Sequence, residues 1–217
     1  MSMSKPKLII FASGTTDSGG TGFENLAEAQ KSGVLDADIV AVVSNHEHGA
    51  VRDRADKLGV PFVFFASDAD YKKIVADAGA EWVALSGWFK IVHGLDPQRT
   101  FNIHPALLSQ LGGRFGGHGM YGAHIHEAVK AAFEAGEISE SGFTMHFVTD
   151  ELDRGPAFFE HRIPLRTGMS TEDIQEAVQA AEHEWQPKIT NMVVHEEISW
   201  DGKDPATLVI PEGVSDR

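Results

Sequence analysis

Residues 7–30 read KLIIFASGTTDSGGTGFENLAEAQ, and this stretch decides the fold. Its first part, Lys7–Ala12, is a short apolar run typical of a buried strand. A glycine-rich loop at residues 13–22 follows, and the helical pattern of Phe23–Gln30 comes directly after the loop. Strand, loop and helix in this order form a βα unit, which predicts parallel strands with helices packed on the sheet.

The same rhythm continues along the next part of the chain. The apolar run at 38–44 (DIVAVVS) precedes a helical stretch at 50–58, and residues 61–65 precede another at 71–78. Residues 81–86 (EWVALS) predict a fourth buried strand. We therefore expect an α/β fold with a central, mostly parallel twisted sheet, helices on both faces and a Rossmann-like N-terminal half.

The rhythm changes in the second half. Residues 112–122 form a glycine-rich stretch ahead of a helical segment at 124–134. Long irregular segments inside compact domains are usually functional loops. Two interpretations of 112–122 stay open, a lid over the active site with Met120 and Tyr121 as its apolar contacts, or a surface insertion.

Two segments of alternating character, 142–149 (GFTMHFVT) and 156–163 (PAFFEHRI), flank an acidic turn. They predict a pair of antiparallel or edge strands. Thr171 at a cap position predicts the start of a long helix that continues to about Val193.

The composition limits the possible functions. The length of 217 residues favours a single domain (1–195) with a C-terminal tail (196–217) that packs on it. The chain has no cysteine, which excludes a disulfide, a thiolate metal ligand and a cysteine nucleophile. A formal net charge of −14, without a cluster of Lys and Arg, argues against nucleic acid and anionic membranes but not against small phosphate esters.

The sequence also lacks a membrane signal. No apolar run reaches the roughly 18 residues of a membrane helix, and the N-terminal residues do not resemble a signal peptide. We expect a cytoplasmic protein with small-molecule substrates, no bound metal, no nucleic-acid or membrane partner, and a monomeric or homodimeric state.

The segment 101–105 (FNIHP) carries the first candidate catalytic residues. Asn102 and His104 lie two residues apart in an extended segment, so both side chains project to one face. An amide N–H and an imidazolium can both stabilise the oxyanion of an acyl-transfer intermediate, each donor being worth roughly 3 kcal/mol. The imidazole can also give a proton to the leaving nitrogen. The alternative is that both residues cap the helix that follows.

Asp153 is the third candidate. It lies in the turn between the two predicted strands, where Gly155 can take unusual dihedral angles and let the backbone approach a ligand. A carboxylate here could raise the pKa of a nearby imidazole or hold a water that relays protons. Alternatively, Asp153 is a solvated turn acid like Asp150 and Glu151.

The loop at 13–22 is a candidate phosphate site, because backbone N–H groups at a helix N-terminus bind anions. It is not a P-loop, since neither Lys-Ser nor Lys-Thr follows its last glycine, and the pattern Gly-x-Gly-x-x-Gly does not occur. On its own the loop is weak evidence.

Two longer motifs identify a family. Residues 102–108 (NIHPALL) and 145–156 (MHFVTDELDRGP) closely resemble the folate-dependent phosphoribosylglycinamide formyltransferases, in the right order and spacing. The similarity extends through nearly the whole chain and includes Ser13-Gly14, Glu24-Asn25-Leu26, Val43-Ser44-Asn45, residues 86–91 (SGWFKI), Glu182-His183 and Pro187.

The resemblance implies a formyltransferase fold with a cleft in which the co-substrate 10-formyltetrahydrofolate meets glycinamide ribonucleotide, in purine biosynthesis. Asn102 would hydrogen-bond the formyl oxygen, and His104 would stabilise the oxyanion and help to transfer protons. Asp153 would position the imidazolium or a relay water. No covalent enzyme intermediate is needed, because the glycinamide amine is the nucleophile.

The resemblance also implies two binding regions. The substrate, phosphoribosylglycinamide, would be bound near its phosphate by Ser13, Gly14, Thr15 and Thr16, and near its amine by Glu182. The folate pocket would be formed by Trp88, Phe89, Lys90, Ile91, Val92, Val148, Thr149, Asp150 and Glu151. The chain departs from the family pattern in its longer first loop, in Ser109-Gln110 where Pro-Lys is common, in the expanded segment 112–122, and in Lys90 where arginine is common.

Two alternatives of other kinds remain. A metal-dependent hydrolase is suggested by the histidines, but no His-Glu-x-x-His pattern exists, and His124 and His126 would not share a helix face; the others are His46, His48, His118, His146 and His161. The second alternative keeps the folate chemistry with another acceptor, as in a formyltetrahydrofolate hydrolase or a formyltransferase for another amine. Those hydrolases usually carry an N-terminal regulatory domain and the tRNA enzymes a C-terminal RNA-binding domain, and we expect neither here.

Overall fold

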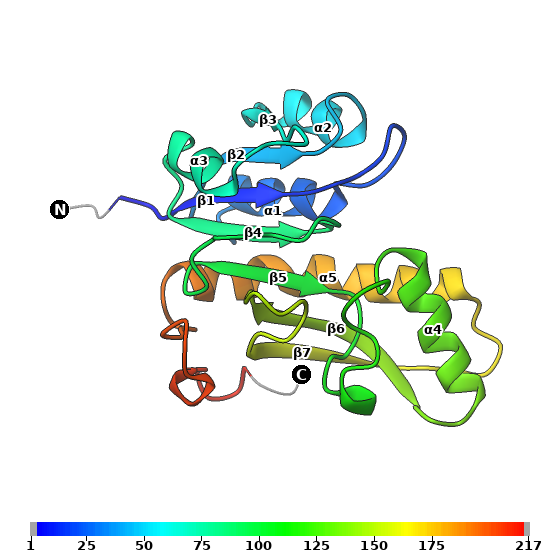
Figure 1. Ribbon diagram of the computed structural model, residues 1–217. Coiled ribbons are helices and arrows are strands. Elements are labelled where there is room, and N and C mark those ends of the chain that lie inside the picture. Colours follow the sequence, from blue (N-terminus) through cyan, green and yellow to red (C-terminus); the bar gives the residue numbers. More distant parts are fainter. Residues whose placement is uncertain (1–3, 215–217) are drawn as a thin grey trace.

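The strands form a seven-stranded sheet in the order β3-β2-β1-β4-β5-β6-β7 in the computed structural model, which describes residues 4–214 (Figure 1). The strands are β1 (Lys7–Phe11), β2 (Asp38–Ser44), β3 (Phe62–Phe64), β4 (Trp82–Ser86), β5 (Thr100–His104), β6 (Glu140–Phe147) and β7 (Ala157–Pro164). The helices are α1 (Thr21–Ser32), α2 (Ala50–Leu58), α3 (Tyr71–Asp77), α4 (Ala123–Glu134) and α5 (Thr171–Val194), with 3₁₀ turns η1 (Gln110–Gly112) and η2 (Pro205–Thr207).

The pairing agrees with the predicted fold class. Strands β1 to β5 run parallel, whereas β6 pairs antiparallel with both β5 and β7. The predicted antiparallel pair is thus confirmed, although Val148 and Thr149 lie in the turn after β6 rather than in the strand. The predicted helix cap is wrong by one residue. The cap is Ser170, whose hydroxyl accepts the Asp173 N–H while the Asp173 carboxylate accepts the Ser170 N–H, and Thr171 is the first helical residue.

Helices cover both faces of the sheet, so the strands are apolar on both sides. Leu8 and Ile10 of β1 pack on one face, in a core shared with α1, α2, α4 and α5. Ile9 and Phe11 point to the other face, in a second core that α3 covers. A continuous apolar run in the first strand is therefore what this position in the sheet requires.

The carboxyl ends of the parallel strands meet at one edge, on the right in Figure 1. After β3 the chain returns to place β4 on the other side of β1, and open α/β sheets bind ligands at such a switch point. Helix α1 starts very close to this point. A Cβ atom on Gly22 would lie 2.2 Å from Ser86 Oγ, so a side chain at position 22 would push the helix away from β4. Gln186 of α5 donates to the same hydroxyl at 3.1 Å.

The chain beyond α5 returns toward the sheet. The Trp200 ring packs on Phe147 of β6 with 5.8 Å between centroids, and Ser199 forms an antiparallel bridge with Val209. The outermost residues of the predicted domain and tail, 1–3 and 215–217, lie outside the described residues.

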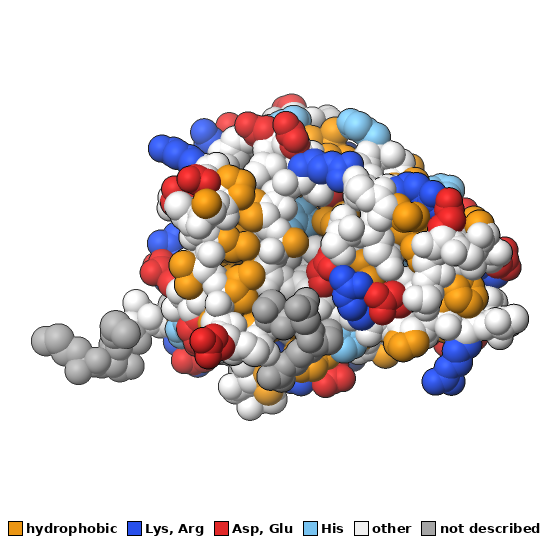
Figure 2. Space-filling view, turned by 90° about the horizontal axis from the view of Figure 1, so that it is seen from below, with side chains coloured by type: hydrophobic (Ala, Val, Ile, Leu, Met, Phe, Trp, Pro, Cys, Tyr) orange, Lys and Arg blue, Asp and Glu red, His pale blue; other side chains and the backbone are white. Residues whose placement is uncertain are grey.

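Two observations describe the surface. None of the helices within residues 4–214 combines the length and apolar character needed to cross a membrane. On the face in Figure 2, hydrophobic side chains lie among acidic and basic ones, and the Lys and Arg side chains do not gather in one continuous patch.

Candidate active site

Strands β5 and β6 carry four polar side chains on one face. Asn102 lies opposite His146 and His104 opposite Thr144 in the antiparallel register, so the four side chains point to the same side of the sheet. Thr144 and both histidines are buried, and Asn102 is half-buried. The two-residue spacing of Asn102 and His104 therefore has the expected result, and β6 adds a second histidine to the group.

The turn after β6 brings Asp153 to this face. Its carboxylate Oδ2 accepts the Gly117 N–H at 2.8 Å and lies 3.7 Å from His104 Nδ1, and its Oδ1 lies 3.6 Å from His146 Nε2. The φ angle of Asp153 is 55°, a left-handed conformation that is uncommon for residues other than glycine and that Asp and Asn adopt more readily than the rest. A turn that keeps a buried carboxylate in this conformation beside two imidazoles is typical of a functional site.

Gly155 has a different role from the predicted one. The sequence predicts unusual dihedral angles there, but the left-handed residue of the turn is Asp153. Gly155 is needed for space, because a Cβ atom on it would lie 1.8 Å from the carbonyl oxygen of Phe147. The two backbone segments can therefore approach each other only with glycine at this position.

His104 contacts protein groups through both ring nitrogens. Its Nε2 lies 2.7 Å from the carbonyl oxygen of Phe115, and since a carbonyl can only accept, Nε2 carries the proton. Burial lowers the pKa of His104 below its usual value, although the Asp153 charge and the Phe115 carbonyl act in the opposite direction. The imidazole is thus neutral at pH 7, with the lone pair of Nδ1 toward Asp153.

Asp153 is ionised in this environment. Burial alone would raise its pKa, but the His146 and His104 imidazoles and the Gly117 N–H together lower the pKa of Asp153 below its usual value. The 3.6 Å contact with His146 is longer than a hydrogen bond, so the Gly117 N–H is the direct hydrogen-bond donor to this carboxylate. A negative charge is therefore in place to stabilise His104 whenever it takes up a proton.

The segment 112–122 is partly built into the site. Phe115 is fully buried, and it and Gly117 supply the backbone groups that hold His104 and Asp153. Tyr121 is 51% exposed, and its ring lies 5.8 Å from that of Phe89, centroid to centroid. The interpretation as a surface insertion is therefore wrong for the first half of the segment, and the lid interpretation stays a prediction for the second half.

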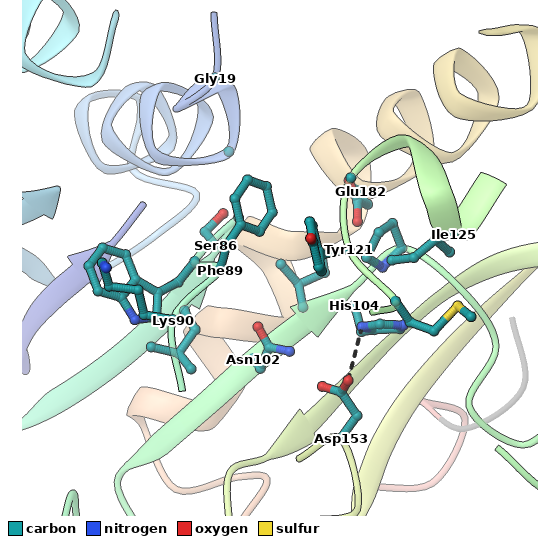
Figure 3. A pocket seen from close by; sticks show the side chains of 18 of the residues that line it. Gly19, Ser86, Phe89, Lys90, Asn102, His104, Tyr121, Ile125, Asp153 and Glu182 are labelled. Atoms are coloured by element: carbon teal, nitrogen blue, oxygen red, sulfur yellow. Dashed lines mark ion pairs between the residues drawn. The ribbon is translucent and has the colours of Figure 1, made fainter. Parts of the chain in front are cut away.

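A cavity of about 800 Å³ opens beside these residues (Figure 3). In this view Asn102 and His104 lie near each other, Asp153 lies below His104 and is joined to it by the dashed line, and Tyr121 and Glu182 lie above His104. Most of the residues that we predicted for the site line this cavity: Asn102, His104, Asp153, Gly14, Thr15, Glu182, Trp88, Phe89, Lys90, Ile91, Val92, Val148, Thr149, Asp150 and Glu151. Ser13 and Thr16 are not among the lining residues.

Ser13 lies behind the cavity and connects two of its walls. Its hydroxyl accepts the Phe89 N–H at 3.0 Å, its N–H donates to Gly87 O at 2.9 Å, and its carbonyl accepts the Ser44 hydroxyl at 2.7 Å. Ser13 is almost fully buried. It therefore shapes the cavity by tying the first loop to the segment 87–92.

A second hydrogen-bonded pair supports the same segment. The Trp88 indole N–H donates to Tyr71 Oη at 3.1 Å, and the Tyr71 hydroxyl donates to the Ile91 carbonyl at 3.1 Å. These contacts leave the side chains of Phe89 and Ile91 53% and 45% exposed, respectively. The segment thus offers apolar side chains on a backbone that is fixed from behind.

The glycine-rich first loop, residues 13–22, also lines the cavity. Gly20 and Thr21, at the start of α1, line the cavity together with Arg54 of α2. Arg54 Nε donates to the Gly19 carbonyl at 3.1 Å, and its guanidinium pairs with Glu24. A helix N-terminus and a guanidinium beside a glycine-rich loop favour an anion here.

A match to a family of known enzymes accords with this geometry. The family model described as "Formyl transferase" matches residues 6–190. The chain belongs to this formyl transferase family. It is 29% identical over 210 residues to the chloroplastic phosphoribosylglycinamide formyltransferase of Arabidopsis thaliana. The aligned residues cover 90% of this chain and 68% of that protein.

Solved structures share the fold. The phosphoribosylglycinamide formyltransferase of Anaplasma phagocytophilum superposes with a TM-score of 0.77 at 23% identity, covering 98% of each chain. A formyltetrahydrofolate deformylase from Pseudomonas syringae pv. tomato gives a TM-score of 0.74 at 22% identity, covering 96% of this chain and 67% of that one. The predicted formyltransferase fold, the family and the enzyme class, a one-carbon transferase, are confirmed.

Two ionisable groups of this formyltransferase on the helical side of the cavity have strongly shifted pKa values. Burial raises the pKa of Glu182 to about 8, so this carboxyl is largely protonated at pH 7. Burial and the neighbouring His104 lower the pKa of His126 to about 4. Both groups are therefore neutral in the free protein, and ionising either of them in this site is costly.

Sequence reasoning missed part of the site. The sequence pattern indicates His146 only as a metal candidate, and it gives no sign of the backbone groups that Phe115 and Gly117 contribute. The signal for His146 was its place in the motif 145–156, but only the strand register puts it opposite Asn102.

The histidines do not form a metal site among residues 4–214, where no three His, Cys, Asp or Glu side chains are arranged to hold an ion. His124 is exposed beside Glu127, whereas His126 is buried, as their two-residue spacing in a helix predicts.

Proposed function

We propose that this chain is a phosphoribosylglycinamide formyltransferase, which moves the formyl group of 10-formyltetrahydrofolate to the amine of glycinamide ribonucleotide. The observation that carries the proposal is the convergence of Asn102, His104 and Asp153 on a cavity that is also lined by the glycine-rich first loop and by the apolar side chains of Phe89 and Ile91. Its volume of about 800 Å³ is in the range of pockets for molecules of this size. The curated relative from Arabidopsis supports the same reaction.

The first loop is the proposed site of the substrate phosphate. Gly14 and Thr15 line the cavity beside the N-terminus of α1 and Arg54, so backbone N–H groups and the helix dipole favour a phosphate dianion there. We propose Gly14 and Thr15 as direct contacts, and we propose that Ser13 acts through the position of the loop. This arrangement gives an acidic protein a local site for an anion.

The segments 88–92 and 148–151 are the proposed folate pocket. Both segments line the cavity, one following β4 and the other following β6. Phe89 and Ile91 supply apolar contact for a flat ring, and the backbone polar groups of both segments can pair with its nitrogen and oxygen atoms.

The catalytic residues are proposed to act on the bond between carrier and formyl group. The substrate amine attacks the formyl carbon, and negative charge develops on the formyl oxygen, where the Asn102 amide N–H stabilises it. The carbonyl then re-forms as the bond between the formyl carbon and the carrier nitrogen breaks, and the carrier leaves. The proton that the amine loses must reach the carrier nitrogen. His104 is neutral and can take up a proton, and the Asp153 charge stabilises the resulting imidazolium.

Glu182 is proposed to receive the substrate amine. A carboxyl with a pKa of about 8 is neutral in the empty cavity and ionises when a cation binds beside it. Proton release on substrate binding is the expected consequence. We also propose small-molecule partners only, a cytoplasmic location and a monomer or homodimer, which fractionation and light scattering would test.

The test is formyl transfer followed by folate absorbance, with and without glycinamide ribonucleotide, and with the product identified by mass. Turnover that requires the ribonucleotide supports the proposal. Folate consumption without an acceptor would instead favour a formyltetrahydrofolate hydrolase. Transfer to other amines but not to glycinamide ribonucleotide would move the function to another acceptor.

A further inference from the structure

His146 is a buried ionisable group beside the catalytic residues that the proposed reaction does not use. It is 2% exposed and lies on β6 directly opposite Asn102. The pairing of β6 with β7 shifts register between Met145 and His146, an irregularity of the kind that re-aims a side chain. This register shift therefore helps to set the direction in which the His146 imidazole points.

The two nitrogens of His146 have different partners. Nδ1 lies 2.8 Å from the carbonyl oxygen of Phe147, and because a carbonyl can only accept, Nδ1 carries the proton of the neutral ring. Nε2 then has a lone pair, and it lies 3.2 Å from Asn102 Nδ2. An amide nitrogen can only donate, so the Asn102 N–H donates to His146 Nε2.

The Phe147 carbonyl is itself held in place. Gly155, in the turn that carries Asp153, approaches it so closely that a Cβ atom there would lie 1.8 Å from the oxygen. The Phe147 N–H also donates to Pro156 O at 3.1 Å. The tautomer of His146 is thus set by backbone that the Asp153 turn fixes.

We propose that His146 is a positioning residue that fixes the amide of Asn102 for the formyl oxygen. If the amide were flipped, its carbonyl oxygen would face the lone pair of Nε2, and this repulsion excludes the flipped orientation. The bond to His146 uses one of the two N–H groups of Asn102 and leaves the other for the developing oxyanion. This inference rests on the proposed role of Asn102 in formyl transfer.

Asp153 is the other group near His146 Nε2, at 3.6 Å from Oδ1. If Nε2 were protonated, it would donate to this carboxylate and could not accept from Asn102. The proposal therefore requires that His146 has its proton on Nδ1 in the resting protein.

The test compares two substitutions of similar size in the full chain. His146→Gln places an oxygen acceptor near the position of Nε2, whereas His146→Met offers only a weak acceptor. We expect His146→Met to lower kcat about 10-fold, less than the roughly 100-fold loss on removing an oxyanion donor, with KM changed less than about 3-fold. His146→Gln should recover most of kcat. Equal losses in both variants, or a change confined to KM, would overturn the proposal.

A double-mutant cycle separates positioning from an independent role. In an Asn102→Ala background, His146→Met should have no further effect on kcat, because the amide that it positions is gone. Multiplication of the two single effects would contradict the proposal.

A measurement independent of activity separates this proposal from the proposed function. ¹⁵N-histidine NMR of the wild-type protein should show His146 with Nδ1 protonated and Nε2 unprotonated, and Asn102→Ala should shift the Nε2 resonance. A protonated Nε2 would overturn the role of His146 even in an active transferase. If the wild type shows the expected tautomer but transfers no formyl group to glycinamide ribonucleotide, it is the proposed function that fails. The same NMR spectra also report whether the variants are folded.

Discussion

The two halves of the sheet build their parts of the cavity in opposite ways. In the parallel half, side chains hold backbone, as Ser13 and Tyr71 do when their hydroxyl groups bind the segment 87–92. In the antiparallel half, backbone holds side chains, since Phe115 O, Gly117 N and Phe147 O bind His104, Asp153 and His146. The parallel half is thus suited to binding and the antiparallel half to chemistry.

The largest loss of kcat is expected from a substitution in the antiparallel half, at His104. His104→Ala should lower kcat about 1,000-fold with a small change in KM, because it removes the group that we propose to exchange protons during the transfer. Steady-state kinetics with both substrates checks this, with the exposed His124→Ala as a control that should stay within about 2-fold. An increase confined to KM would assign His104 to binding and would contradict the conclusion that the antiparallel half carries the chemistry.

The second largest loss of kcat is expected from a substitution of Asp153, the carboxylate beside His104. Asp153→Asn should preserve the fold and lower kcat about 100-fold, since the amide cannot stabilise the imidazolium. Kinetics combined with urea unfolding measures both properties, and Asp68→Asn, on the exposed surface, is the matched control. Near-native turnover of Asp153→Asn would remove the carboxylate from the mechanism.

Glu182 belongs to α5, which packs behind the sheet. The raised pKa of this carboxyl predicts that the unfolding free energy of the protein depends on pH. Its folded pKa of about 8 lies above the ordinary value, so between pH 4.5 and 8 the folded protein keeps a proton that the unfolded chain has lost. The unfolding free energy therefore falls as the pH rises through this window. Between pH 6 and 8 the wild type should lose about 2 kcal/mol more than Glu182→Gln, measured by urea unfolding at both pH values. The same pH dependence in both proteins would show that Glu182 titrates normally.

The smallest effect is expected from the parallel half. Tyr71→Phe keeps the ring but removes the hydrogen bonds to Trp88 and Ile91, and should raise KM for the folate about 5-fold with kcat unchanged. A fall in kcat with constant KM in Tyr71→Phe would show that this half also takes part in the chemistry.

The parallel half could be predicted closely from the sequence. The helix at 50–58 has the predicted bounds, and strand β2 does as well. Apolar runs of this length followed by turn residues and helical periodicity leave little choice of structure, because each strand must be buried on both faces. The candidate residues of this half, except Ser13 and Thr16, line the cavity. The positions of Ser13 and Thr16 depend on how the backbone of the first loop folds, and the order of the residues does not determine this path.

The antiparallel half was predicted less completely. The spacing of Asn102 and His104 indicated a shared face, but the partner of that face, His146, depends on the register between β5 and β6. Register is set by packing and turn geometry, and a shift of one residue would turn His146 away from Asn102. The unusual angle predicted for Gly155 belongs to Asp153 for the same reason, since the close approach to Phe147 is a contact between distant segments.

The sequence by itself determined the α/β class, the formyltransferase resemblance and the choice of Asn102, His104 and Asp153 as candidate catalytic residues, because periodicity and motif are properties of neighbouring residues. The tertiary structure alone decided the proton positions. Phe115 and Phe147 place the protons of His104 and His146, and both contacts require backbone carbonyls to be fixed within 3 Å of an imidazole. Burial also lowers the pKa of the His104 imidazole and raises the pKa of the Glu182 carboxyl. Such effects arise from the exclusion of water by the whole fold, which no single stretch of sequence contains.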